Sequence, residues 1–302
     1  MENFISLIIL FALGYSLKHI PAFPKDTATS LNLFVIYVSL PALILYQVPN
    51  ITISNSILVP IVMPWVMLLL SALSVLWISR IFKWSKKVTG ALLLLVPLGN
   101  TSFLGIPMVT IFFGADKVSY AVLYDQFGTF LALSVYGTFV LAFYADGSKP
   151  SLKYIANKII TFPPFIALII ALLTSSFEYH DYLISSFKLI SASLVPVVMV
   201  AIGFQFKLVL NKKEFIPLGV GLLLKLIIAP LVALSLCYVF GFSGIIPEVT
   251  VFESAMPPMV TAGALAIMGG LAPELVAAMI GWGIILSFIT LPLMFKLIQF
   301  IL

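Results

Sequence analysis

Residues 96–107 read Val96-Pro97-Leu98-Gly99-Asn100-Thr101-Ser102-Phe103-Leu104-Gly105-Ile106-Pro107, and they lie inside an apolar stretch that is long enough to span a lipid bilayer. The stretch nevertheless contains two prolines, two glycines and three hydrogen-bonding side chains. Proline removes a helical N–H group and clashes with the preceding turn, and Asn, Thr and Ser compete with the helix for backbone partners. The pattern therefore predicts that a helix breaks here, at membrane depth.

A second break of the same kind is predicted far downstream, at Glu253-Ser254-Ala255-Met256-Pro257-Pro258. Lipid cannot hydrogen-bond to backbone groups that a break sets free, so broken helices occur in membranes only where protein buries them or where they line a wet cavity. Two interrupted helices at corresponding positions of two halves are the best sequence indication of the binding site of a transporter.

The composition is that of an all-α polytopic membrane protein. Of the 302 residues, 62% are hydrophobic and 9% are charged, whereas a soluble domain has roughly 25% charged residues. The net charge of +5 comes from residues between the apolar runs, so membrane topology explains it and we predict no nucleic-acid partner. The single cysteine, Cys237, rules out an internal disulfide and a cysteine-rich metal site. We predict no metal and no cofactor, apart from a coupling proton or Na⁺.

At about 20 residues per span, the apolar runs predict ten transmembrane helices. The longest hydrophilic segment, 146–161, is interpreted as a cytoplasmic linker between a first five-helix repeat at 1–145 and a second at 162–302. An odd number of spans per half means that the second repeat enters the membrane with inverted topology. The predicted spans are 3–20, 31–49, 57–79, 88–113, 118–145, 162–178, 185–206, 214–241, 248–271 and 274–299.

The basic residues predict the orientation, because short cytoplasmic loops carry an excess of Lys and Arg. With both termini outside, 12 of the 16 basic residues fall in cytoplasmic loops. The opposite side holds Lys117 and Lys296, and Lys188 is expected at the interface there. The predicted cytoplasmic residues are Lys18, Lys25, Arg80, Lys83, Lys86, Lys87, Lys149, Lys153, Lys158, Lys207, Lys212 and Lys213; Glu178, Asp181 and Glu248 lie on the outer side.

Weak internal symmetry supports a duplicated unit. Ser39-Leu40-Pro41 in the second span is similar to Ser193-Leu194-Val195-Pro196 in the seventh, and the two prolines are 155 positions apart. The fourth span is expected to break around Pro107 and the ninth around Pro257, 150 residues further on. Inverted repeats of this kind are common in secondary transporters.

The polar residues at the breaks predict an anion site. Each break creates a half-helix N-terminus with free N–H groups and partial positive charge, which favours a carboxylate without an arginine. Asn100, Thr101 and Ser102 add donors at the first break, and Thr261 does so after the second. The alternative is that these side chains only cap the broken helix ends.

Four further residues are candidates for coupling to an ion or proton: Asp125, Thr129, Lys225 and Glu253. Ionisable groups within membrane spans are costly and usually functional. Asp125 could instead be a structural partner that closes the crossover, and Glu253 could be an interfacial carboxylate. Lys225 could neutralise an acid, attract the substrate, replace a coupling sodium, or extend its amine to the membrane surface.

Both breaks and two other segments resemble the auxin efflux carrier family, which includes the plant PIN proteins and many bacterial permeases. The short central loop is similar to that of the bacterial members. The matching segments are Gly99-Asn100-Thr101-Ser102-Phe103-Leu104-Gly105-Ile106-Pro107, Tyr124-Asp125-Gln126-Phe127-Gly128, Met256-Pro257-Pro258 and Leu40-Pro41-Ala42.

This resemblance implies a ten-helix fold related to that of the bile-acid-type sodium symporters. In that fold a panel domain (spans 1, 2, 6 and 7) faces a core domain (spans 3–5 and 8–10). The broken spans four and nine cross at the substrate site, which adds Pro107, Pro257 and Pro258 to the candidate substrate-binding residues. Typical substrates are organic anions, namely auxin in plants and malate- or malonate-like acids proposed for bacterial relatives.

We therefore predict a secondary carrier for a small organic anion, working by alternating access in the cell (inner) membrane. A sodium-coupled symporter of the bile-acid type is the alternative, and the direction of transport, the coupling and a homodimer stay open. A channel is less favoured because channels need repeated pore rings or oligomeric filters. An enzyme is not expected, because the chain has no Gly-x-Gly-Asp, Gly-x-Ser-x-Gly or His-Glu-x-x-His motif.

Overall fold

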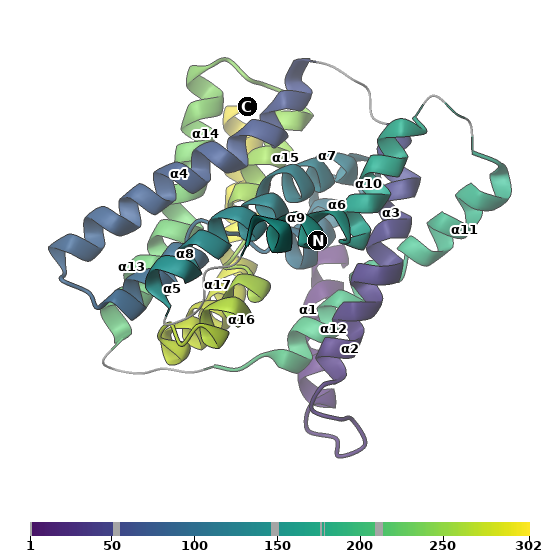
Figure 1. The fold of residues 1–302 in the computed structure, drawn as a ribbon. Helices are drawn as coiled ribbons and strands as arrows, with labels where there is room; N and C mark the ends of the chain where they lie inside the picture. The colour runs from purple at the N-terminus through teal and green to yellow at the C-terminus, as the bar shows by residue number, and fades with distance from the viewer. Residues whose placement is uncertain (1, 51–54, 146–150, 176, 178, 209–213) are drawn as a thin grey trace.

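The computed structural model describes residues 2–50, 55–145, 151–175, 177, 179–208 and 214–302 (Figure 1). All regular elements in these ranges are helical. The α-helices are α1 Glu2–Leu17, α2 Thr27–Phe34, α3 Leu40–Gln47, α4 Leu58–Ile81, α5 Lys86–Leu95, α6 Ile106–Phe112, α7 Val118–Leu123, α8 Thr138–Tyr144, α9 Leu152–Ile160, α10 Pro163–Leu173, α11 Asp181–Ser191, α12 Leu194–Gln205, α13 Phe215–Leu223, α14 Ala229–Val239, α15 Ile245–Ser254, α16 Val260–Met268 and α17 Pro273–Ile301.

Several of these helices continue into one another through wider, π-helical turns, which often mark functional sites. Five such turns occur in the described ranges: η1 Val35–Ser39, η4 Thr101–Gly105, η6 Tyr124–Phe130, η7 Leu133–Gly137 and η9 Leu224–Ile228. They join α2 to α3, lead into α6, connect α7 to α8 and join α13 to α14.

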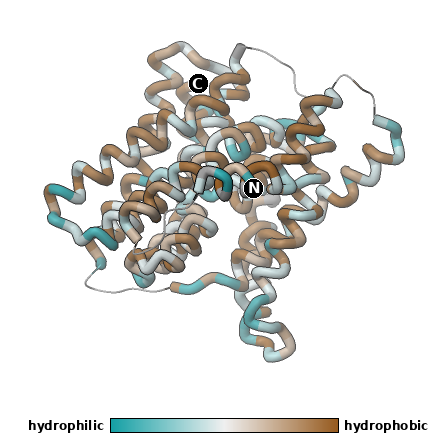
Figure 2. Tube along the Cα trace, in the orientation of Figure 1, coloured by the Kyte–Doolittle hydropathy of each residue, from teal (hydrophilic) through white to brown (hydrophobic). Residues whose placement is uncertain are grey.

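Six continuous helical segments of the described chain are long and apolar enough to cross a membrane, which is consistent with a polytopic membrane protein. Hydrophobic residues predominate along the helices, and hydrophilic residues gather at turns such as those after α1 and α4 (Figure 2). The segments are Thr27–Gln47, Leu58–Ile81, Ala115–Tyr144, Asp181–Gln205, Phe215–Val239 and Pro273–Ile301. The first and sixth predicted spans correspond to shorter apolar helices, and the fourth and ninth are each divided in two.

The fourth span breaks earlier than the sequence suggested. Helix α5 ends at Leu95, and the chain is helical again from Thr101 through Phe112. Pro107 therefore lies within a helix, and the prediction of a break around it was wrong. The helix tolerates Pro107 because this residue lies in the first turn of α6, directly after the wide turn η4. The proline of the break is Pro97.

The second break is where it was predicted. Helix α15 ends at Ser254 and α16 begins at Val260, which leaves Pro257 and Pro258 between them. The two breaks pair with each other as a short antiparallel bridge between Gly99 and Pro258. The symmetry argument that matched Pro107 with Pro257 was therefore off by about two turns, because Pro107 does not belong to the paired segment.

The helices form two groups that meet along a seam. The first group contains α1, α2, α3 and α10–α12, and the second contains α4–α8 and α13–α17 (Figure 1). Contacts of α3 with α7 and of α12 with α6 connect them. Within the predicted linker, residues 152–160 form helix α9. Lys149, Glu178, Lys212 and Lys213 lie outside the described residues, as does the side chain of Lys158.

Two glycines bring the backbones of α1 and α12 into direct contact. A Cβ atom on Gly203 would lie 2.0 Å from the carbonyl oxygen of Phe11, and one on Gly14 would lie 2.1 Å from that of Val200. Only glycine leaves room for so close an approach, because the neighbouring atoms belong to the main chain and cannot move aside as a side chain could. These two contacts hold the first helical group together at its centre.

We expect Gly203→Ala to destabilise the protein, since overpacking of this kind costs about 1–3 kcal/mol. Gly219→Ala is the matched control, because Gly219 is also helical and a Cβ atom added there would have no neighbour within 4 Å. The measurement is thermal unfolding of the purified protein in detergent. Gly203→Ala should melt several degrees below wild type and Gly219→Ala at or above it; equal melting of the two variants would contradict the contact.

Candidate functional site

The site is built around the crossing of the two breaks. The amide of Asn100 donates to the carbonyl oxygen of Pro257 (2.8 Å), and the amide of Met259 donates to that of Leu98 (3.0 Å). These reciprocal bonds satisfy backbone groups that lipid could not. Pro257 and Pro258 therefore shape the crossing through their backbone, and two helix N-termini start beside it, at Thr101 and Val260.

Asn100 is the residue before η4, and it lines a cavity of about 110 Å³ on the seam between the helical groups. The residue is 1% exposed, and its Nδ2 has no hydrogen-bond partner among the described residues. Ser102 and Thr261 line the same cavity. The remaining lining is apolar: Ile36, Leu40, Phe103, Phe130, Leu133, Phe162 and Met259.

An amide donor without a partner is costly in a buried place. The cavity next to Asn100 therefore suits a ligand that brings a hydrogen-bond acceptor. The structure brings together three of the predicted substrate-binding residues here, namely Asn100, Ser102 and Thr261. Pro107 is buried in α6 and lines neither this cavity nor the one described below.

Thr101 points away from that cavity, toward Asp125. Its Oγ1 donates to Asp125 Oδ1 at 2.5 Å, and Ser102 Oγ donates to the same oxygen at 2.6 Å. Gln126 Nε2 donates to the second oxygen, Oδ2, at 2.6 Å. Asp125 is fully buried in the wide turn η6, and the two donors Thr101 and Ser102 fix the first residues after the break to the fifth predicted span.

Glu253 and Lys225 form a second polar group on the other side of the crossing. Glu253 is fully buried in the last turn of α15, so its interpretation as an interfacial carboxylate was wrong. Lys225 is 3% exposed, and its Nζ lies 3.4 Å from the carbonyl oxygen of Ser254, so its amine does not extend to the membrane surface.

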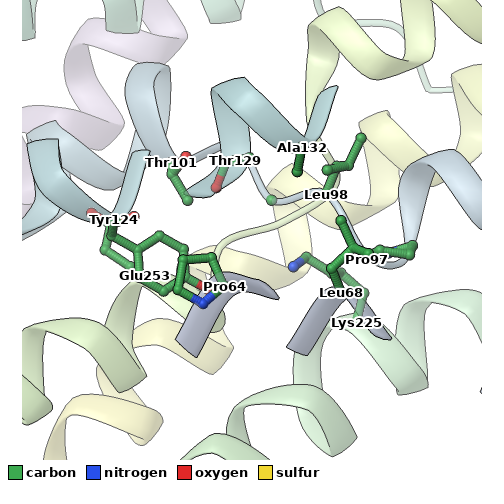
Figure 3. A pocket seen from close by; sticks show the side chains of 11 residues that line it. Pro64, Leu68, Pro97, Leu98, Thr101, Tyr124, Thr129, Ala132, Lys225 and Glu253 are labelled. Atoms are coloured by element: carbon green, nitrogen blue, oxygen red, sulfur yellow. The ribbon is translucent and has the colours of Figure 1, made fainter. Parts of the chain in front are cut away.

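These two side chains line a very small cavity of about 10 Å³, together with Thr101, Tyr124 and Thr129 (Figure 3). Neither oxygen of the Glu253 carboxyl group has a hydrogen-bond partner among the described residues. A cavity of this size holds about one water molecule. The two acids thus differ in their surroundings. Asp125 accepts three hydrogen bonds, whereas Glu253 accepts none from the described residues and lines a cavity with room for about one water molecule.

Gly99 and Gly105 create the room for this arrangement. A Cβ on Gly105 would lie 2.3 Å from Glu253 Oε2, and one on Gly99 would lie 3.1 Å from Lys225 Nζ. Sequence reasoning placed both glycines in the motif, yet it did not assign them to these neighbours, and it missed Tyr124 as part of the lining. Their partners come from distant helices, so no local pattern identifies them.

Among the described residues, no three His, Cys, Asp or Glu side chains gather in a way that could hold a metal ion. The polar groups of the site are instead amides, hydroxyls, two carboxyl groups and one amine. Such groups can bind an organic ion or exchange a proton without a cofactor.

Comparison with known proteins identifies a family and two relatives for this chain. The family described as Membrane transport protein matches residues 1–295. An uncharacterized transporter of Methanothermobacter thermautotrophicus is 30% identical over 298 residues, which cover 97% of this chain and 96% of that protein. An uncharacterized transporter of Methanocaldococcus jannaschii is 27% identical over 289 residues, covering 93% of this chain and 92% of that protein.

The apolar helices, the crossing of two broken ones and these matches define a membrane transporter, not an enzyme. The chain belongs to the membrane transport protein family, to which the auxin efflux carriers also belong, and the resemblance inferred from the motifs is confirmed.

Proposed function

We propose that this protein is a secondary carrier for a small organic anion, with its substrate site in the cavity beside Asn100. One observation carries the proposal: the buried Nδ2 of Asn100 lacks a partner in a cavity between the two helical groups. Two helix N-termini start next to it and favour a carboxylate. A cavity on the seam is also where relative movement of the two groups would expose a substrate to either side in turn.

The proposed architecture has ten spans in two inverted repeats of five, at 1–145 and 162–302. The first helical group would be the panel (spans 1, 2, 6 and 7), and the second the core (spans 3–5 and 8–10). The contacts of α1 with α12 and of α3 with α10 and α11 support this grouping.

The dimensions of the cavity favour a compact acid. Its volume of about 110 Å³ lies well below the 300–1,000 Å³ typical of sites for drug-sized molecules, so a sterol-like acid is disfavoured. Phe130 and Phe162 stack at a centroid distance of 4.1 Å beside it and could hold an apolar part of the substrate. Short dicarboxylates and small aromatic acids are both candidates.

Glu253 is proposed as the coupling group. Its unpartnered carboxyl group and the amine of Lys225 share a cavity of about one water volume. The charge of Lys225 opposes the entry of a second cation, so a proton is favoured over Na⁺. The alternative of a sodium symporter is supported by the same free oxygens and is separated from proton coupling by the test below.

Asn100→Ala should weaken substrate binding about tenfold to hundredfold, because a hydrogen bond to a charged group contributes about 1.5–3 kcal/mol. The substrate would first be found by a thermal-shift screen of the purified protein against short dicarboxylates and aromatic acids, since ligands stabilise the folded state. Uptake into proteoliposomes then gives the apparent affinity. Asn157→Ala, at an exposed asparagine on α9, is the control. Wild-type affinity in Asn100→Ala would exclude this site.

The two buried acids should respond differently to loss of their charge. Glu253→Gln removes a titratable group whose two oxygens accept no hydrogen bond from the described residues, so we expect near-normal stability and uptake that no longer depends on pH. Asp125→Asn turns an acceptor of three hydrogen bonds into a side chain with a donor, so it should lower the melting temperature. The measurements are uptake between pH 5 and 8, with and without Na⁺, and thermal unfolding.

Lost Na⁺ dependence in Glu253→Gln would favour the symporter alternative instead. If Glu253→Gln kept both the pH and the Na⁺ dependence of wild type, Glu253 would not be the coupling group. An uncoupled uniport driven by the membrane potential, worth about 2.3 kcal/mol per charge per 100 mV, would then replace the proposal.

The proposed orientation places both termini outside and Arg80, Lys86 and Lys153 in the cytoplasm. In a Cys237→Ser background, cysteines introduced at these three positions should resist a membrane-impermeant maleimide in intact cells and react after permeabilisation. Asp181→Cys, on the proposed outer side, is the matched control and should react in intact cells. The reverse labelling pattern would invert the topology.

A further inference from the structure

A third cavity, which the sequence did not indicate, opens on the seam between the two helical groups. Its volume is about 590 Å³, within the range of small-molecule sites. It lies between α3, α11 and α12 of the first helical group and α6 and α7 of the second. Its polar lining consists of Tyr46, Gln47, Thr110, Asp116, Lys188 and Ser191.

This cavity neighbours the one beside Asn100, because residues about one helical turn apart line the two cavities in succession. On α3, Leu40 lines the Asn100 cavity, and Leu43, about one turn further on, lines the larger one. On the segment from η4 into α6, Phe103 lines the Asn100 cavity and Ile106 lines the larger one. All four side chains belong to one apolar cluster. A single apolar layer, about one helical turn thick, therefore separates the two cavities.

The charge of the larger cavity is set by Lys188. Asp116 is the other charged residue in the lining, and its Oδ2 lies 2.6 Å from the amine of Lys117, which compensates it. Among the described residues, Lys188 forms no ion pair. Lys188 is an exposed residue of α11, as an interfacial position would require, and it also lines the wall of this cavity.

We propose that this cavity is an outer vestibule that binds small organic carboxylates weakly and leads them to Asn100, with Lys188 supplying the attracting charge. The inference rests on the proposed function, because it assigns an entry path to the same substrate. A cleft with one sign of charge and apolar walls focuses the field and raises local concentrations of the opposite ion about 10–1,000-fold. The amide of Gln47 and the hydroxyl of Thr110 offer further polar contacts.

The first test does not require transport. Ala192 is exposed, lines the vestibule and lies one turn after Lys188. In a Cys237→Ser background, Ala192→Cys should react several-fold faster with an anionic methanethiosulfonate than with a cationic one, relative to a free thiol. Adding Lys188→Glu should reverse this preference, whereas Lys296→Glu, at an exposed lysine that lines none of these cavities, should leave it unchanged. If Lys188→Glu left the preference for the anionic reagent unchanged, the proposal would be overturned.

Protection of the introduced cysteine from modification by added compounds identifies the class of ligand that the cavity binds. Millimolar malonate or indole-3-acetate should slow the modification of the introduced cysteine, and an uncharged amide of the same size should not. Equal protection by acid and amide, or none by either, would show that the cavity does not select carboxylates, and the proposal would fail.

The second test uses uptake. Lys188→Gln should raise the KM for substrate on the outer side several-fold with little change in kcat, and Lys188→Arg should restore it. Lys296→Gln should behave as wild type. A wild-type outer KM in Lys188→Gln would overturn the vestibule in a protein that transports. Absence of organic-anion uptake by the wild-type protein would instead refute the proposed function, and the charge preference of the introduced cysteine would still report on the vestibule.

Discussion

The rest of the structure depends on two backbone hydrogen bonds between segments 98–100 and 257–259. An unsatisfied backbone group within a bilayer costs several kcal/mol, so neither helix could be interrupted alone. Paired, the two breaks supply each other's missing partners and leave helix ends at membrane depth. The polar side chains of the site, Asn100 above all, stand where they do because this exchange holds the chain open at that point.

The crossing also gives the two buried acids different hydrogen-bonding environments. Asp125 receives three donors, two of them from the first residues after the break, and so fastens the second half-helix to its neighbour. Glu253 receives none from the described residues and shares its small cavity with Lys225. A fully hydrogen-bonded carboxylate is suited to structure, and one with free oxygens is suited to exchange with a mobile ion.

Much of this could be predicted from residue types alone. Prolines and glycines within apolar runs identified both breaks, and the polar residues Asn100, Ser102 and Thr261 were expected near one ligand. The register of the first break could not be predicted, because Pro97 and Pro107 are equivalent locally and only the pairing of Gly99 with Pro258 separates them. The contrast between Asp125 and Glu253, and the place of Lys188 on a cavity wall, depend on side chains from distant helices, which periodicity does not reveal.

The wide turns have a consequence for how the site is encoded. Each π-helical turn adds about one residue to its helix, which rotates everything beyond it by about 100° relative to an unbroken α-helix. Asp125, Lys225 and Thr101 all stand in such turns. The site is therefore specified by helical phase as well as by residue identity. In relatives of this protein, a one-residue gap in these turns would redirect a whole helical face and could alter selectivity while every polar side chain was kept.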